Sequence, residues 1–261
     1  MLKLGLIGKN IEYSFSRGYF ADKFNKLDIK ASYVNFDCDT LEDVQRILND
    51  PSILGYNVTI PYKQEVISLL DHLDEHVERI GAVNTIKRNQ DNSLTGYNTD
   101  FVGFAQSLLE FLGSENEVRN FQLPKDKWVA GKKALILGTG GASKAVAYAL
   151  EGMAAHVYYV SRKQKLEENI LAYIDLAKKT LDPYDIIVNT TPLGTYPNIH
   201  EAPEIPYRTL DSKHLLYDLV YNPEETRFLL KGKENGAHVT NGLKMLELQA
   251  DAAWDLWHSK I

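Results

Sequence analysis

The most constraining feature of the sequence is an apolar run that passes directly into glycines. Residues 133–137 read Lys-Ala-Leu-Ile-Leu, and Gly-Thr-Gly-Gly-Ala-Ser follows at 138–143. Such a run is typical of a buried strand, and the glycines mark a tight turn into a helix. Glycine backbone admits close approach of a phosphate, and the N–H groups of a helix N-terminus favour an anion. The pattern predicts a dinucleotide site, with a tight turn that binds no ligand as the alternative.

Strand-like and helix-like segments alternate along the whole chain. In the first half, short apolar runs at 4–7, 33–36 and 54–60 are separated by amphipathic stretches at 18–27 and 41–48. This alternation is typical of β-α-β units and predicts a sheet rich in parallel strands. The overall class is therefore α/β.

From residue 83 the pattern changes. Extended pieces at 85–87 and 94–97 flank an Asp-Asn-Ser turn and predict a hairpin, and a helix is expected over 101–112. Four further strands are expected at 156–160, 185–188, 215–218 and 237–240. Their alternation with helices favours a doubly wound, Rossmann-like second domain that ends with a helix over 243–257.

The composition of the chain limits which partners it can bind and in which cellular compartment it is expected. The chain has 261 residues and a formal net charge of -6, which supplies no basic surface for nucleic acid. Cys38 is the single cysteine, so an intrachain disulfide cannot form and a reducing compartment is expected. The first apolar run is too short for a signal sequence, and no stretch approaches the ~18 apolar residues of a membrane span. We expect a cytoplasmic protein with no membrane or nucleic-acid partner.

The residues after the strand expected at 156–160 indicate which dinucleotide is bound. Ser161, Arg162 and Lys163 stand where an acidic residue would contact the ribose 2′-hydroxyl of NAD. Two cations would instead attract a 2′-phosphate, so the sequence favours NADP, with NAD as the less favoured cofactor. The alternative is that both cations only cover the surface at a strand end.

The first half carries a set of residues suited to proton transfer. Thr59 and Lys63 follow a strand that a proline ends, at the carboxyl edge where open α/β sheets bind ligands. A lysine can give a proton to a forming alkoxide, although a single lysine is more often only solvated. Asp100 could be the partner of Lys63, or it could cap the next helix, as Asn98 could.

Taken together, ordered motifs along the whole chain resemble the shikimate dehydrogenase family. The motifs of the substrate half are Ser14-x-Ser16, Asn57-Val58-Thr59-x-Pro61-x-Lys63, Gly81-Ala82-Val83-Asn84-Thr85 and Asn98-Thr99-Asp100. Those of the cofactor half are Gly138-x-Gly140-Gly141-Ala142-Ser143 and Asn189-x-Thr191-x-x-Gly194. Tyr217-Asp218-x-x-Tyr221 and Asn241-Gly242-Leu243-x-Met245-Leu246-x-x-Gln249 complete the set.

The resemblance implies a fold and a reaction. The expected fold is an N-terminal α/β substrate domain, residues 1–101, completed by residues 241–261 because the last helix returns to it. Residues 102–240 would form the Rossmann-like dinucleotide-binding domain. The implied reaction is reversible, NADPH-dependent reduction of 3-dehydroshikimate to shikimate, in chorismate and aromatic amino-acid biosynthesis. No metal is implied, and a monomer or homodimer is expected.

The resemblance also assigns roles to residues. Lys63 would be the general acid/base and Asp100 its partner. Substrate would be bound by Ser14, Ser16, Thr59, Asn84, Tyr221 and Gln249. The cofactor would be bound by Gly138, Thr139, Gly140, Gly141, Ala142, Arg162, Leu219 and Gly242.

Three other functions compete with this interpretation. His72, Glu75 and His76 match a zinc-hydrolase pattern, with two imidazoles one helical turn apart. Residues 69–79 suggest a polar-faced helix, however, where such histidines are usually only solvated. A sensor that binds the ring acid or the dinucleotide without catalysis is the second. A dehydrogenase for quinate or a similar ring acid is the third, because one extra hydroxyl changes few contacts.

Overall fold

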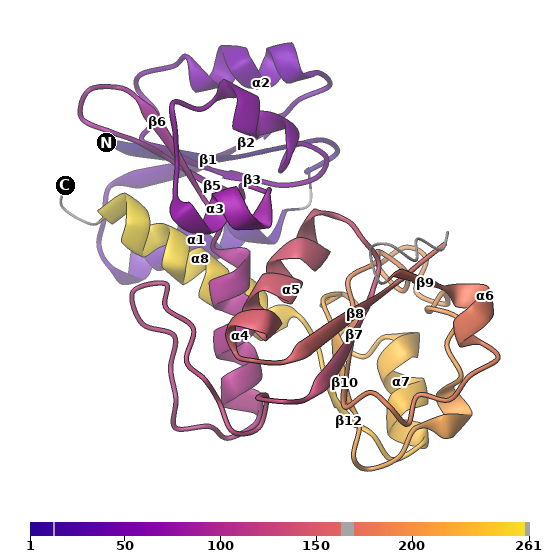
Figure 1. Ribbon diagram of the computed structural model, residues 1–261. Coiled ribbons are helices and arrows are strands. Elements are labelled where there is room, and N and C mark those ends of the chain that lie inside the picture. The colour runs from indigo at the N-terminus through magenta and orange to yellow at the C-terminus, as the bar shows by residue number, and fades with distance from the viewer. Residues whose placement is uncertain (13, 163–169, 259–261) are drawn as a thin grey trace. The chain divides into compact units, whose positions relative to one another are not determined.

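A computed structural model describes residues 1–12, 14–162 and 170–258 (Figure 1). The chain divides into two compact units. The first comprises residues Met1–Thr99 with Gln249–Ile261, and the second comprises Asp100–Leu248. Each unit is built on one six-stranded sheet.

The first sheet has the strand order β2-β1-β3-β5-β6-β4. Its central strand β1 (Leu2–Gly8) pairs in parallel with β2 (Ala31–Asp37) and β3 (Gly55–Val58). The expected hairpin is confirmed as β5 (Thr85–Arg88) and β6 (Leu94–Tyr97), and β5 runs antiparallel to β3. The carboxyl ends of β1, β3 and β6 therefore lie at the same edge of the sheet as the start of β5.

Helices α1 (Phe15–Lys26) and α2 (Leu41–Leu48) connect the parallel strands of this sheet. Helix α2 has the bounds expected from its amphipathic pattern, and its start is set locally. Thr40 and Asp43 form a reciprocal capping box at its start, and Val44 and Leu48, one turn apart, are buried. Beyond its end, the buried Arg88 guanidinium donates to the carbonyl oxygens of Ile53 and Leu48.

The expected polar-faced helix over residues 69–79 is wrong. A 3-10 helix, η1 (Glu65–Leu69), is followed by the short strand β4 (His72–Leu73), and α3 (Glu75–Ile80) begins only after Asp74, whose carboxylate caps it. His72 thus lies in a strand paired with β6, while His76 lies in α3. The two imidazoles do not share a helix, so the geometric basis of the zinc-hydrolase alternative fails.

The second sheet has the order β12-β11-β10-β7-β8-β9, and all the pairs described are parallel. Its strands are β7 (Lys133–Leu137), β8 (His156–Ser161), β9 (Ile170–Ala172), β10 (Ile186–Asn189), β11 (Leu215–Asp218) and β12 (His238–Thr240). Numbered from β7, this is the 3-2-1-4-5-6 order of the Rossmann fold. The expected α/β class with a Rossmann-like second domain is confirmed.

In the described part of this unit, four helices accompany the second sheet, together with the short 3-10 helix η3 (Tyr207–Thr209). They are α4 (Asp100–Phe111), α5 (Gly141–Gly152), α6 (Tyr173–Leu176) and α7 (Arg227–Glu234). The sheet core between them is apolar, with Leu135, Ile187 and Leu216 fully buried.

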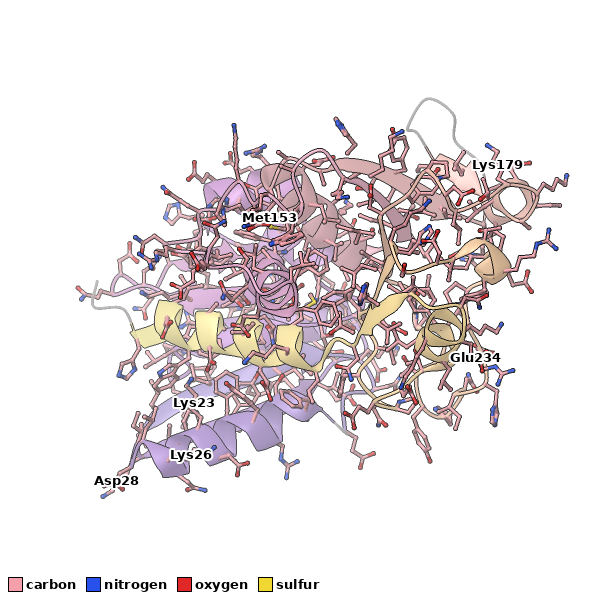
Figure 2. All side chains as sticks on the ribbon, turned by 90° about the horizontal axis from the view of Figure 1, so that it is seen from below. Lys23, Lys26, Asp28, Met153, Lys179 and Glu234 are labelled. Carbon is pink, nitrogen blue, oxygen red and sulfur yellow. The ribbon has the colours of Figure 1, made fainter. Side chains whose placement is uncertain are left out.

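The last helix, α8 (Leu243–His258), ends in the first unit, beside α1 (Figure 2). Trp254 packs on Phe24, and Trp257 packs on Phe20 and donates to the carbonyl oxygen of Ile86, 2.9 Å away. The return of the last helix to the first domain is confirmed. None of the described helices is long and apolar enough to cross a membrane.

Candidate active site

Asn84 is the centre of a buried polar network in the first unit. It directly precedes β5 and is 2% exposed. Its Oδ1 accepts from the Thr99 N–H at 2.6 Å, and its Nδ2 donates to Thr99 Oγ1 at 3.0 Å and to Gln249 Oε1 at 3.3 Å. The structure thus brings together Asn84 and Gln249, two expected substrate ligands that are far apart in the sequence. These bonds hold both side-chain amides in defined orientations.

The network continues through side chains that the sequence reasoning missed. Asn57, in the buried strand β3, accepts from the Tyr33 hydroxyl at 2.7 Å and donates to Thr85 Oγ1 at 3.2 Å. Burial raises the pKa of Tyr33, and a hydrogen bond to Ser16 acts in the opposite sense. Ser16, an expected substrate ligand, is therefore tied to the same network. An amide inside an otherwise apolar strand was the available sign, because buried polar groups require partners.

Thr59 and Lys63 follow β3, at the edge where Asn84 lies. The Thr59 N–H donates to the Ile7 carbonyl at 2.9 Å, and the Lys63 carbonyl accepts from the Val83 N–H at 2.7 Å. Both side chains are half-buried. The expected position at the carboxyl end of the strand is confirmed.

Three polar residues lie at the starts of α1 and α4. Ser14 occupies the N-cap position of α1, but its hydroxyl makes no capping hydrogen bond. The side-chain amide of Asn98 donates to the carbonyl oxygen of Ala82, 2.9 Å away. Asp100 is the first residue of α4 and is 7% exposed. Since Asp100 and Lys63 belong to different units, their pairing remains a prediction.

The glycine turn after β7 is partly exposed and includes a position that requires glycine. Gly138 has φ +113°, and a Cβ there would lie 2.8 Å from Thr190 Oγ1, so only glycine fits. A Cβ on Gly140, the N-cap of α5, would meet no atom within 4 Å. Thr139 and Gly140 are exposed, while Gly141 and Ala142 open the helix with N–H groups that have no intrahelical acceptor. This exposed turn at a helix N-terminus fits a dinucleotide diphosphate.

The other expected cofactor residues lie at the same edge of the second sheet. Arg162 is exposed just beyond β8, and Lys163 lies outside the described residues. Leu219 and Gly242 follow β11 and β12 and approach so closely that a Cβ on Gly242 would be 2.2 Å from the Leu219 carbonyl oxygen. The structure therefore brings these two residues together.

Tyr221 follows Leu219 by two residues and is half-buried. Burial raises the pKa of Tyr221, so its phenol stays protonated and can donate a hydrogen bond at neutral pH. Cys38 behaves differently from a reactive thiol: burial, with nearby Asp43, raises its pKa to about 11.

A Rossmann sheet with an open glycine turn, joined to a separate unit with a buried amide and hydroxyl network, defines a dinucleotide-dependent oxidoreductase with its own substrate domain. Comparison with family models agrees. Residues 6–86 match the shikimate dehydrogenase substrate binding domain, and residues 110–198 match the NAD binding domain of D-isomer specific 2-hydroxyacid dehydrogenases.

Individual relatives cover nearly the whole chain. The NADP(+) shikimate dehydrogenase of Clostridium botulinum is 37% identical over 98% of this chain and 96% of its own. A shikimate dehydrogenase crystallised with NADP+ superposes with a TM-score of 0.86 at 32% identity, covering 100% of this chain and 91% of that one. The Thermus thermophilus enzyme, crystallised with NADP(H) and shikimate, gives 0.82 at 30% identity, covering 100% and 95%. The chain belongs to the shikimate dehydrogenase family.

Proposed function

We propose that this chain catalyses the NADPH-dependent, reversible reduction of 3-dehydroshikimate to shikimate, as part of chorismate and aromatic amino-acid biosynthesis. The observation that carries the proposal is the buried network around Asn84 and Gln249 in a chain 37% identical to an NADP(+) shikimate dehydrogenase. Shikimate carries one carboxylate and several hydroxyls, so oriented amides and hydroxyls suit it as ligands. The substrate is a small molecule, and we infer a cytoplasmic monomer or homodimer.

Each expected ligand has a role in this proposal. Ser14 and Ser16 supply hydroxyls for the substrate carboxylate. Asn84, Thr59, Gln249 and Tyr221 hold the ring hydroxyls. The amide of Asn84 suits this role because Thr99 and Gln249 fix its orientation. Binding energy from these groups places the reacting carbon in a defined geometry, which accelerates the reaction.

Lys63 and Asp100 carry out proton transfer. The bound nicotinamide supplies or accepts the hydride. During reduction, Lys63 gives a proton to the oxygen that becomes the hydroxyl, and during oxidation it removes that proton. Asp100, buried at the start of α4, accepts a hydrogen bond from the reacting hydroxyl.

The glycine turn, residues Gly138 to Ala142, receives the diphosphate, while Leu219 and Gly242 border the nicotinamide half. In this proposal Arg162 contacts the 2′-phosphate, which favours NADP over NAD. Exposure of Arg162 beyond β8, the second strand of the Rossmann order, supports this assignment.

The deciding experiment is reduction of NADP followed by absorbance, with shikimate or quinate, and repeated with NAD. Shikimate with NADP should give the highest kcat/KM. Lys63→Ala should reduce turnover by about 10²- to 10⁴-fold, while Lys26→Ala, an exposed lysine on α1, should leave it unchanged. Preferential turnover of quinate would replace the substrate assignment. Tight binding of shikimate and NADP without any turnover would support a sensor instead.

A further inference from the structure

The carboxylate of Asp218 connects three segments at the carboxyl edge of the second sheet. Asp218 ends β11 and is fully buried. Its Oδ1 accepts from Asn189 Nδ2 at 2.9 Å and from the Val220 N–H at 3.0 Å, and its Oδ2 accepts from the Thr226 hydroxyl at 2.5 Å. One side chain therefore holds the end of β10, the first turn after β11 and the start of α7.

Each partner organises its own segment in turn. Asn189 uses its Oδ1 to accept from the Thr191 N–H at 3.1 Å and the Thr191 hydroxyl at 2.6 Å, which shapes the turn after β10. Thr226 caps α7 by accepting from the Leu229 N–H at 3.3 Å. Asn189 and Thr226 thus each use an oxygen as acceptor within their own segment, and each donates a hydrogen bond to Asp218.

The segment held between these anchors contains two proposed ligand-binding residues. Leu219 and Tyr221 lie on either side of Val220, whose N–H is bound by Asp218 and whose carbonyl accepts from the Gly242 N–H at 3.3 Å. The Leu219 N–H donates to the Asn189 carbonyl at 3.0 Å. Any loss of the Asp218 contacts therefore acts on the residues at the proposed cofactor and substrate positions.

We infer that Asp218 is a positioning residue, whose ionised carboxylate holds Leu219 and Tyr221 in the geometry needed to bind cofactor and ring acid. The inference rests on the proposed function for the identity of those ligands. An ionised carboxylate accepts from all three donors, whereas a protonated carboxyl would turn one of its oxygens into a donor and reverse that hydrogen bond.

The surroundings of Asp218 oppose that charge. Burial raises the pKa of Asp218 to about 6, although the hydrogen bonds from Thr226, Val220 and Asn189 act to lower it. Among the described residues, the titratable group that acts electrostatically with it is the Tyr207 phenol of η3, and no basic side chain contributes to the shift. A buried carboxylate without a cationic partner is a cost to the fold. Its presence is explained if binding depends on the charge.

The test is Asp218→Asn in the full chain, with Asp211→Asn as the matched control. Asp211 precedes the same strand, at the opposite end of β11, and its side chain is 53% exposed. The asparagine keeps an oxygen toward Asn189 and Val220 but turns a donor toward Thr226. We expect kcat/KM for shikimate to fall about tenfold or more at pH 8, with weaker NADPH binding by fluorescence and an undiminished melting temperature. Asp211→Asn should match the parent.

The pH profile separates positioning from a merely structural role. Below pH 6 the parent carboxylate becomes protonated, so the ratio of parent to Asp218→Asn activity should decline toward one. A variant that folds and keeps kcat/KM within about twofold of the parent at pH 8, or a ratio that does not change with pH, overturns the inference.

If Asp218→Asn does not fold, two variants of Thr226 test the same inference. Thr226→Val removes the hydroxyl donor and should reduce NADPH affinity and kcat/KM, whereas Thr226→Ser keeps the donor and should restore both. Equal loss in the two variants contradicts the inference. NADPH binding is measured without turnover. A parent that binds NADPH but does not oxidise shikimate would therefore refute the proposed function while leaving the positioning test readable.

Discussion

At the scale of single residues, the first unit depends on the orientation of amides. Asn84 accepts through Oδ1 from a backbone N–H and donates through Nδ2 to two oxygens, so its two ends are not interchangeable. A carboxylate has the same shape as the Asn84 amide but no donor. The chemical difference between these two side chains is the basis of a direct test.

We expect Asn84→Asp to raise KM for shikimate and to lower stability. The new carboxylate would face Gln249 Oε1 and Thr99 Oγ1 where Nδ2 now donates, and an unpaired buried polar group costs about 1–3 kcal/mol. Steady-state kinetics and urea unfolding measure the two effects. Asn92→Asp, at an exposed turn, is the control. Unchanged kinetics in Asn84→Asp would remove Asn84 from the substrate site.

Asp218 predicts a pH dependence of stability with a defined sign. Its pKa is raised from 3.8 to about 6 on folding, so the folded protein binds this proton more tightly than the unfolded chain. The contribution to stability is complete below about pH 4 and is lost as pH rises through 6. A shift of this size corresponds to roughly 3 kcal/mol.

Asp218→Asn lacks this titration. Its free energy of unfolding relative to the parent should therefore increase between pH 5 and pH 8, as measured by urea unfolding at both values. A relative stability that is the same at both pH values would show that Asp218 does not titrate in this range.

At the scale of elements, two turns of the second unit lie so close together that one of them requires a glycine. Gly242 follows β12 and passes within reach of the Leu219 backbone, so an added methyl would contact a carbonyl group rather than a movable side chain. Gly242→Ala should displace one of these turns and raise the Kd for NADPH by about tenfold or more, measured by fluorescence. Gly18→Ala, in α1, has open space around its Cβ and should bind NADPH like the parent. Equal affinity in both variants would show that the turns do not border the cofactor.

Helix α8 stabilises the first unit through its aromatic face. Trp254 is 6% exposed and packs on Phe24 (5.7 Å between ring centres). Trp254→Ala should lower the free energy of unfolding by about 3–5 kcal/mol, because the cavity adds to the lost apolar burial. Trp128→Ala, at a position 50% exposed, should cost much less. Similar losses in the two variants, measured by urea unfolding, would contradict the docking of α8.

At the scale of the whole molecule, two units divide two recognition tasks. Residues expected to choose the dinucleotide lie along the second sheet, and most residues expected to choose the ring acid lie along the first. A substitution in one unit should therefore change the specificity for its own ligand and leave the specificity for the other ligand unchanged.

Arg162→Ala tests this separation. Loss of the guanidinium should raise the KM for NADP about tenfold or more, since a charged hydrogen bond to a phosphate is lost, and leave the KM values for NAD and shikimate within about twofold. Arg208→Ala, an exposed arginine of η3, is the control. An equal effect on NADP and NAD would show that Arg162 does not read the 2′-phosphate.

Local features were predicted from the sequence because their causes lie within a few residues. The apolar run of β7 and the amphipathic period of α2 gave both elements their observed bounds, and the glycines after β7 marked the turn. Motif order was enough to indicate the family, because each motif is read along the chain without knowledge of distant contacts.

Tertiary structure decided the rest. The strand β4 is only two residues long and forms because it pairs with β6. This pairing cannot be read from the residues around His72, whose local pattern suggested a helix. The bonds from Tyr33 to Asn57 and from Asn189 to Asp218 join residues 24 and 29 positions apart, and no local pattern specifies them. Short-range propensity sets the elements of this protein, whereas the partners of its buried polar groups are set by the fold that removes them from water.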